Sequence, residues 1–203
     1  MIIDWRRHEG DRHALTATPE EYDAHPPLPA LIVDGAPRRL DPDRLALAAY
    51  LAFGRWCAGD LTLPAQGASP AVAEAIEDDA RPVRVRPNPV QYAPRALVRG
   101  EAEVAVSTSL PVEGAAGPRI AVVPSTVAEG RLRTGDATVV ASNAFLFDAA
   151  VEPVQSFRAH LAVAVLFAED HTAAGLRLPS EAVGDADMAP LRALLRSVNL
   201  SLR

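Results

Sequence analysis

The sequence contains no lysine, because all 20 of its Lys and Arg side chains are arginine. A Walker-A phosphate loop, a pyridoxal phosphate Schiff base, a Lys-dependent aldolase and Ser-x-x-Lys acyl transfer all need the lysine amine. These mechanisms are therefore excluded for this chain. The preference for Arg, together with much Ala and Pro, is typical of a GC-rich genome. An Arg at a single position is thus no functional signal in itself.

Cysteine is almost absent as well. Cys57 is the only one, which excludes an intrachain disulfide and a cysteine-based zinc or iron–sulfur centre. It follows Trp56 near the end of an apolar segment, where a free thiol usually behaves as a small apolar side chain. No two of the five histidines stand four residues apart, so the local sequence does not support a zinc site. We expect neither a metal nor a cofactor.

Long apolar runs and several catalytic motifs are also missing. No apolar stretch approaches the length of a membrane-spanning helix, and the N-terminal segment has charges where a signal peptide needs a continuous apolar core. We therefore expect a cytoplasmic protein that does not enter a membrane. Gly-x-Ser-x-Gly, His-Glu-x-x-His, Gly-x-Gly-x-x-Gly and EF-hand patterns do not occur.

The overall composition is that of an ordinary globular protein. Hydrophobic residues make up 49% and charged residues 23%, and the formal net charge of −6 argues against nucleic acid as a partner. A chain of 203 residues can bury a sizeable core. We expect one α/β domain over residues 1–203, while two halves at about 28–100 and 101–203 stay open as an alternative.

Helix and strand signals alternate along the chain. Asp41-Pro42 and Ser69-Pro70 each combine an N-cap residue with a proline at the first helical position. Strands are expected in the segments "DLTLP" and "RPVRVRP" and in three later apolar runs, while Asp34-Gly35 is a hairpin signal. This order predicts an α/β fold with a mixed, partly parallel sheet flanked by helices.

Two further patterns concern the halves of the chain. "LALAAYLAFGRWCAGDLTLP" resembles "HLAVAVLFAEDHTAAGLRLP", which suggests an internal pseudo-repeat, although chance similarity in an Ala/Leu-rich chain explains it equally well. The segments 45–56 and 157–167 are apolar all round, too apolar for burial on one side alone. On that ground we expect a homodimer.

Three of the expected strands end on small polar residues. If the strands are parallel, these ends meet at one edge of the sheet, where α/β proteins bind ligands, and a helix beginning after Thr126 would offer free N–H groups to an anion. The alternative is that Ser, Thr and Asn are simply common at caps and turns. The candidate ligand-binding residues are Ser107, Thr108, Ser125, Thr126, Ser142 and Asn143.

A basic stretch provides a second candidate site. Guanidinium groups bind carboxylates and phosphates in a bidentate manner, and Arg84 and Arg95 are the candidate ligand-binding residues here. The stretch consists of Arg81, Arg84, Arg86, Arg95 and Arg99. The stretch directly follows the acidic segment "EAIEDD", so a solvated, self-paired surface is the alternative interpretation.

These features predict a cytoplasmic α/β binding or accessory protein that holds a small anionic ligand or docks a protein partner. The alternative is a cofactor-free enzyme that acts on an anionic metabolite through Ser, Thr, Asn and Arg groups at strand ends. His160 or Asp148 would assist such a reaction. The catalytic residues, if any, stay unknown, since no pair of nucleophile and base is recognisable in the sequence.

Overall fold

The structure, a computed structural model, describes residues 1–94, 98–110, 117–148, 157–179 and 185–203. The strands are β1 (Ile2–Arg7), β2 (Arg12–Thr18), β3 (Ala30–Asp34), β4 (Gly59–Thr62), β5 (Val85–Asn88), β6 (Ala102–Ser107), β7 (Arg119–Pro124), β8 (Arg131–Thr134), β9 (Ala137–Ser142), β10 (Ala173–Arg177) and β11 (Ser201–Leu202). The helices are α1 (Pro42–Phe53), α2 (Pro70–Asp79), α3 (Ala144–Asp148), α4 (Arg158–Phe167) and α5 (Asp185–Ser197), with 3-10 turns η1 (Gly54–Trp56) and η3 (Ala168–His171).

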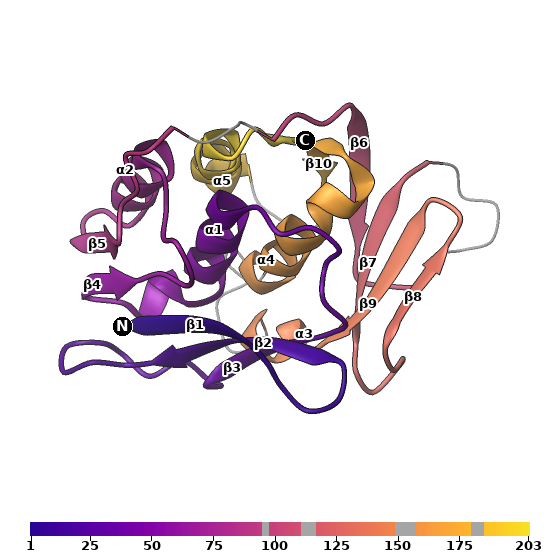
Figure 1. The fold of residues 1–203 in the computed structure, drawn as a ribbon, viewed down its shortest axis with the longest axis horizontal. Coiled ribbons are helices and arrows are strands. Elements are labelled where there is room, and N and C mark those ends of the chain that lie inside the picture. Colours follow the sequence, from indigo (N-terminus) through magenta and orange to yellow (C-terminus); the bar gives the residue numbers. More distant parts are fainter. Residues whose placement is uncertain (95–97, 111–116, 149–156, 180–184) are drawn as a thin grey trace.

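All the strands belong to one mixed sheet. Its order is β11-β10-β6-β7-β9-β3-β2-β1-β4-β5, with β8 attached to β9. The pairs on either flank are parallel, whereas β1–β2, β2–β3, β3–β9 and β8–β9 are antiparallel. The sheet curls around α1 and α4, and α2 and α5 lie between its two ends (Figure 1). The predicted mixed, partly parallel α/β fold is therefore confirmed.

Helix α1 begins where the sequence predicts. Asp41 Oδ1 accepts hydrogen bonds from the backbone N–H groups of Asp43 and Arg44, each at 3.0 Å, and Pro42 occupies the first helical position. Residues 44–53 are all buried. This burial holds a helix of weak amphipathic pattern in place, because apolar contacts surround it on every side.

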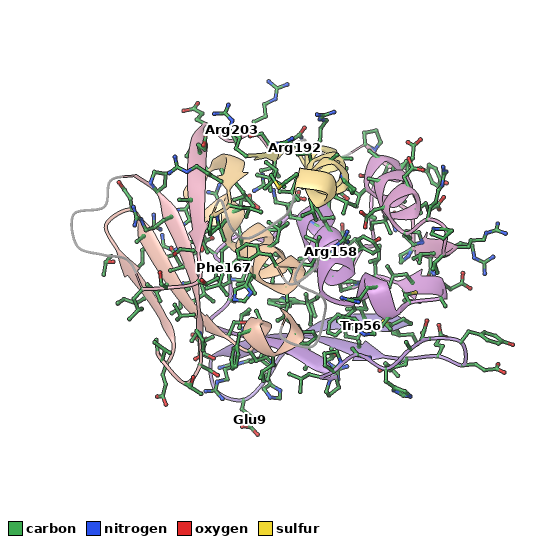
Figure 2. The ribbon with its side chains drawn as sticks, turned by 180° about the vertical axis from the view of Figure 1, so that it is seen from behind. Glu9, Trp56, Arg158, Phe167, Arg192 and Arg203 are labelled. Carbon is green, nitrogen blue, oxygen red and sulfur yellow. The ribbon has the colours of Figure 1, made fainter. Side chains whose placement is uncertain are left out.

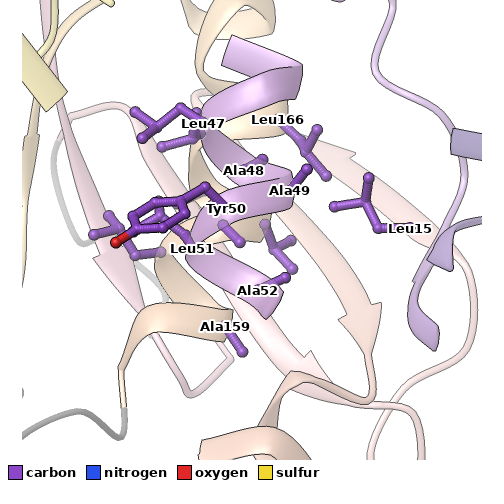
Figure 3. Close-up of a cluster of buried hydrophobic side chains, with 14 of the residues drawn as sticks. Leu15, Leu47, Ala48, Ala49, Tyr50, Leu51, Ala52, Ala159 and Leu166 are labelled. Carbon is purple, nitrogen blue, oxygen red and sulfur yellow. The ribbon is translucent and has the colours of Figure 1, made fainter. Parts of the chain in front are cut away.

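The two most apolar helices cover each other inside one chain. In α4, residues 159–167 are all buried, and the helix packs directly against α1. Figure 3 shows the resulting cluster, which contains Leu47 and Leu51 of α1 together with Leu166 and Ala159 of α4. The apolarity of these helices is thus explained by one chain, and it no longer argues for a dimer.

Two local expectations differ from the structure. Gly35 has a positive φ of +79°, yet β3 forms no hairpin with the segment after it and pairs instead with β2 and β9. Pro37 and the start of α1 follow Gly35 too closely for a returning strand. Residues 125–127 form a turn rather than the start of a helix, and the strand β8 follows.

The similarity between the two halves stays a prediction. Each segment forms a helix and a strand and is followed by a second helix, with the order α1, β4, α2 in the first half and α4, β10, α5 in the second. Within the described residues, no helix is long and apolar enough to cross a membrane.

Candidate functional site

The three polar strand ends lie on parallel strands. β7 pairs in parallel with both β6 and β9, so the carboxyl ends of all three point toward one edge of the sheet. The ends of β7 and β9 are in direct contact, because the backbone N–H of Ser125 donates to the carbonyl oxygen of Ser142 at 3.2 Å. The strand-end hypothesis required these three strands to be parallel, and they are.

Ser142 and Asn143 use their side chains to bind the neighbouring strand β3. Ser142 is 2% exposed, and its Oγ donates to the carbonyl oxygen of Ile32 at 2.7 Å. Asn143 Oδ1 accepts from the N–H of Ile32 at 2.8 Å, and its Nδ2 donates to the carbonyl oxygen of Ala30 at 3.0 Å. Both residues thus extend the β3–β9 ladder. Their polar side-chain atoms bond to the β3 backbone, and a ligand would need these same atoms.

The other strand-end residues lie at the surface. Ser107 Oγ donates to the carbonyl oxygen of Ser109 at 3.1 Å, closing a local turn. Thr108, Ser125 and Thr126 are exposed. Residues 125–127 form a turn and not the start of a helix. The positive end of a helix dipole, which would attract an anion, is therefore missing beside these side chains.

The remaining candidates are scattered. Arg84 is exposed beside a cavity of about 360 Å³ that Arg81 and Arg86 also line. Arg95 lies outside the described residues, as does the side chain of Asp148. His160 is 7% exposed and stacks on Phe157 with ring centres 5.3 Å apart.

A different cavity brings charged groups together. Its volume is about 300 Å³, and it lies where the end of α1, η1, the end of α2, the start of β5 and the start of α4 meet. Tyr50, Arg55, Cys57, Asp79 and Arg158 line it. We call these five residues the Arg55/Arg158 site; Figure 2 labels Arg158, together with Trp56, the residue next to Arg55.

Asp79 is the anchor of the Arg55/Arg158 site. Its side chain is 5% exposed and accepts from both terminal nitrogens of Arg158, at 2.8 Å and 3.1 Å. Tyr50 Oη donates to the same carboxylate at 2.6 Å. A bidentate ion pair of this kind fixes the plane of the guanidinium and leaves its remaining N–H donors free to bond elsewhere.

Arg55 is the second cation of the site. Its guanidinium lies over the ring of Trp56, with Cζ 5.2 Å from the ring centre. Burial lowers the pKa of Arg55, and repulsion from Arg158 lowers it further. Among the described residues no carboxylate forms an ion pair with Arg55. Arg81 lines the cavity as well, but its guanidinium pairs with Asp78, as that of Arg158 pairs with Asp79.

The backbone of η1 lies close against Tyr50. A Cβ atom added at Gly54 would lie 2.2 Å from the Cδ2 and Cε2 atoms of the Tyr50 ring, so only glycine fits there. Gly54 thus allows α1 to end with Tyr50 directed at Asp79 and with Arg55 immediately beside it. The order Tyr50, Gly54, Arg55 along the chain is what places a phenol and a cation at one cavity.

Neither potential nucleophile of the site is activated. Burial and the neighbouring Asp79 carboxylate raise the pKa of Tyr50, and burial raises the pKa of Cys57 to about 11. The Cys57 thiol also donates to the carbonyl oxygen of Asp60 at 3.6 Å. At neutral pH both groups stay protonated, so they act as donors or apolar surface rather than as nucleophiles.

We expect Cys57 to react slowly with iodoacetamide. At pH 8 a thiol with this pKa should react roughly a hundredfold more slowly than a free cysteine, because the thiolate is the reacting form. The rate, followed by mass spectrometry, should rise to that of free cysteine when the chain is unfolded in urea. If Cys57 in the native protein reacts as fast as in the unfolded chain, its thiol is not buried and its pKa is not raised.

This site was not predicted from the sequence, because Asp79 and Arg158 lie far from Tyr50 and from each other along the chain. Tyr50 and Asp79 lie in two helices, and Arg158 lies far along the chain with ordinary apolar neighbours. The basic stretch, by contrast, has its arginines close together in the sequence. A weak signal was present in Arg158, a charge at the start of a helix that is otherwise almost wholly apolar.

Among the described residues no group of three His, Cys, Asp or Glu side chains is arranged to hold a metal ion. Comparisons with protein-family models, with curated proteins and with solved structures found no match.

Proposed function

We propose that the chain is a cytoplasmic binding protein that holds a small anionic ligand at the Arg55/Arg158 site. The observation that carries this proposal is the excess of cationic groups around one cavity: Asp79 pairs with Arg158, and Arg55 has no such partner among the described residues. Two guanidinium groups directed at one space repel each other, and an anion between them removes that repulsion.

The size of the cavity limits the ligand class. A volume of about 300 Å³ is at the lower end of small-molecule sites. Phosphate, sulfate, a small carboxylate or a small phosphate ester fits this space and the hydrogen-bonding geometry of guanidinium groups. The strand-end residues supply no support for this ligand, since Ser142 and Asn143 bond to β3.

An enzymatic role remains the alternative proposal, with less support. Nucleophilic or general-base catalysis needs a group with a pKa near the working pH, and the pKa values of Tyr50 and Cys57 are shifted upward, away from that range. Binding needs no such group. The site therefore supports a ligand-holding function better than a covalent reaction.

The test is thermal stabilisation by anions in two matched variants. Phosphate, sulfate and citrate are each added to the native protein, whose melting temperature should rise by mass action. Arg55→Gln should weaken binding of the effective anion roughly 5–100-fold, the effect of losing a charge-assisted hydrogen bond. Arg84→Gln is the control, since Arg84 lines a different cavity.

Loss of the stabilisation in Arg84→Gln but not in Arg55→Gln would place the ligand on the basic stretch instead. No stabilisation by any of the anions would contradict the proposal as a whole.

A further inference from the structure

A second concave surface lies on the outside of the molecule, between α2 and α5. These helices contact each other between the two ends of the sheet (Figure 1). The groove between them has a volume of about 620 Å³. Ala71, Ala75 and Ala193 are among the residues that line it. Such small side chains allow another helix to approach closely.

The two sides of this groove carry opposite charge. On the α2 side the exposed charged side chains lining the groove are Glu74, Asp78 and Arg81, and on α5 the charged side chain is Arg196. Arg192, labelled in Figure 2, adds a second exposed cation to α5. The α2 side of the groove is therefore acidic, and the α5 side is basic.

These charges do not neutralise each other across the groove. Within the described part of the chain no ion pair joins α2 to α5. Asp78 pairs instead with Arg81 on its own side, at 2.8 Å, where both side chains are largely exposed. Glu74 and Arg196 thus present complementary charges to whatever lies in the groove.

We propose that the α2/α5 groove is the interface with a second copy of this chain. Under a two-fold axis, the acidic α2 of one protomer lies against the basic α5 of its partner, and the reverse contact forms at the same time. A surface that is acidic on one side and basic on the other is complementary to itself in this arrangement. Two helices from each protomer then form a four-helix layer over the alanine-lined groove.

This proposal does not depend on the anion site. It also rests on a different surface from the apolarity of α1 and α4, which one chain already explains. Asp79, at the end of α2, and Arg81, just after it, line both the groove and the anion cavity, so the two sites share one wall.

The experiment uses charge reversal at Glu74 and Arg196, with the mass measured by sedimentation equilibrium at ~50 µM, where an interface of standard size holds. The native protein should be a dimer. Glu74→Arg and Arg196→Glu should each weaken dimerisation roughly 10–100-fold, because each puts like charges together twice in a symmetric dimer. Glu77→Arg is the matched control, since Glu77 is exposed on α2 but does not line the groove.

Mixing the two weakened variants gives the decisive result. In a mixed dimer, one contact joins the reversed charge of the Glu74→Arg chain to the reversed charge of the Arg196→Glu chain, and these two charges attract. The native Glu74 and Arg196 side chains meet at the other contact. The equimolar mixture should therefore form dimers within about threefold of native affinity. An attraction confined to one protomer cannot produce this rescue, since each variant chain still carries like charges on both sides of its own groove.

Three results would overturn the proposal. They are a native protein that is monomeric at this concentration, single variants that dimerise normally, and a mixture that stays monomeric. Circular dichroism of each variant checks the fold, and retention of dimers in Glu77→Arg shows that a change of net charge alone does not dissociate them.

Discussion

An Asp79→Ala variant is expected to lose about 3–5 kcal/mol of unfolding free energy, the usual result of breaking a buried ion pair by removing one partner. Asp79 is 5% exposed in its side chain, and the paired Arg158 side chain is 20% exposed. Its removal leaves the Arg158 guanidinium and the Tyr50 hydroxyl without their acceptor. Urea denaturation of native and variant protein measures the difference.

Asp78→Ala provides the control for this measurement. Asp78 is the preceding residue, and it pairs with Arg81 where the two side chains are 58% and 76% exposed. Exposed pairs of this kind contribute about 0–1 kcal/mol. An Asp79→Ala variant as stable as Asp78→Ala would mean that the bidentate pair does not hold the start of α4 against the end of α2.

The second large effect is expected at Asp23. Its side chain is 2% exposed and lies 2.7 Å from the α-amino group of Met1, which is itself fully buried. Asp23 also accepts hydrogen bonds from the backbone N–H groups of Glu20 and Ala58, each at 2.8 Å. Asp23→Ala in this chain should lower the unfolding free energy by about 3–5 kcal/mol, since it leaves a buried ammonium without its closest partner.

This ion pair gives a defined pH dependence. Burial raises the pKa of Asp23, but its bonds to the amine and to two backbone N–H groups outweigh burial, and the net pKa is lowered from 3.8. Burial lowers the pKa of the Met1 amine, but bonds to Asp23 and Glu20 outweigh it, and the net pKa is raised from 8.0. The stabilisation from this ion pair is therefore fully present between pH 3.8 and pH 8.0, the ordinary pKa values of the two groups.

The stabilisation is lost in both directions outside this window. It falls as the pH drops through the lowered pKa of Asp23, and it falls as the pH rises through the raised pKa of the amine. In Asp23→Ala, the unfolding free energy should depend less on pH in both of these ranges. Glu20→Ala is the control, because Glu20 is 51% exposed and should contribute little. Equal losses in the two variants would contradict the central role of Asp23.

The predictable part of the fold followed from local chemistry. Asp41 with Pro42 determined the start of α1, and alternating burial along β5 matched its alternating sequence. β2 was missed because "RHALTAT" has only a short apolar pattern, and its pairing with β1 and β3 depends on residues outside the segment itself. The hairpin expected at Asp34-Gly35 was wrong because Pro37 and the start of α1 leave no room for a returning strand.

The candidate site was harder to predict than the fold. Strand ends can be inferred from sequence, and the parallel order of β7 and β9 agrees with that inference. The sequence could not show that Asn143 bonds to β3, because β3 lies more than a hundred residues earlier. The pairing of Asp79 with Arg158 has the same long-range character. It arises from the packing of helices rather than from any motif.

The most direct test of the anion site is an NMR titration of the native protein with inorganic phosphate, following the arginine side-chain Nε–H resonances. We expect the resonances of Arg55 and Arg158 to shift together along one saturable curve, because both guanidinium groups line the same cavity. The Arg84 resonance should stay unchanged. Unshifted Arg55 and Arg158 resonances, or small unsaturable shifts at all exposed arginines alike, would contradict it.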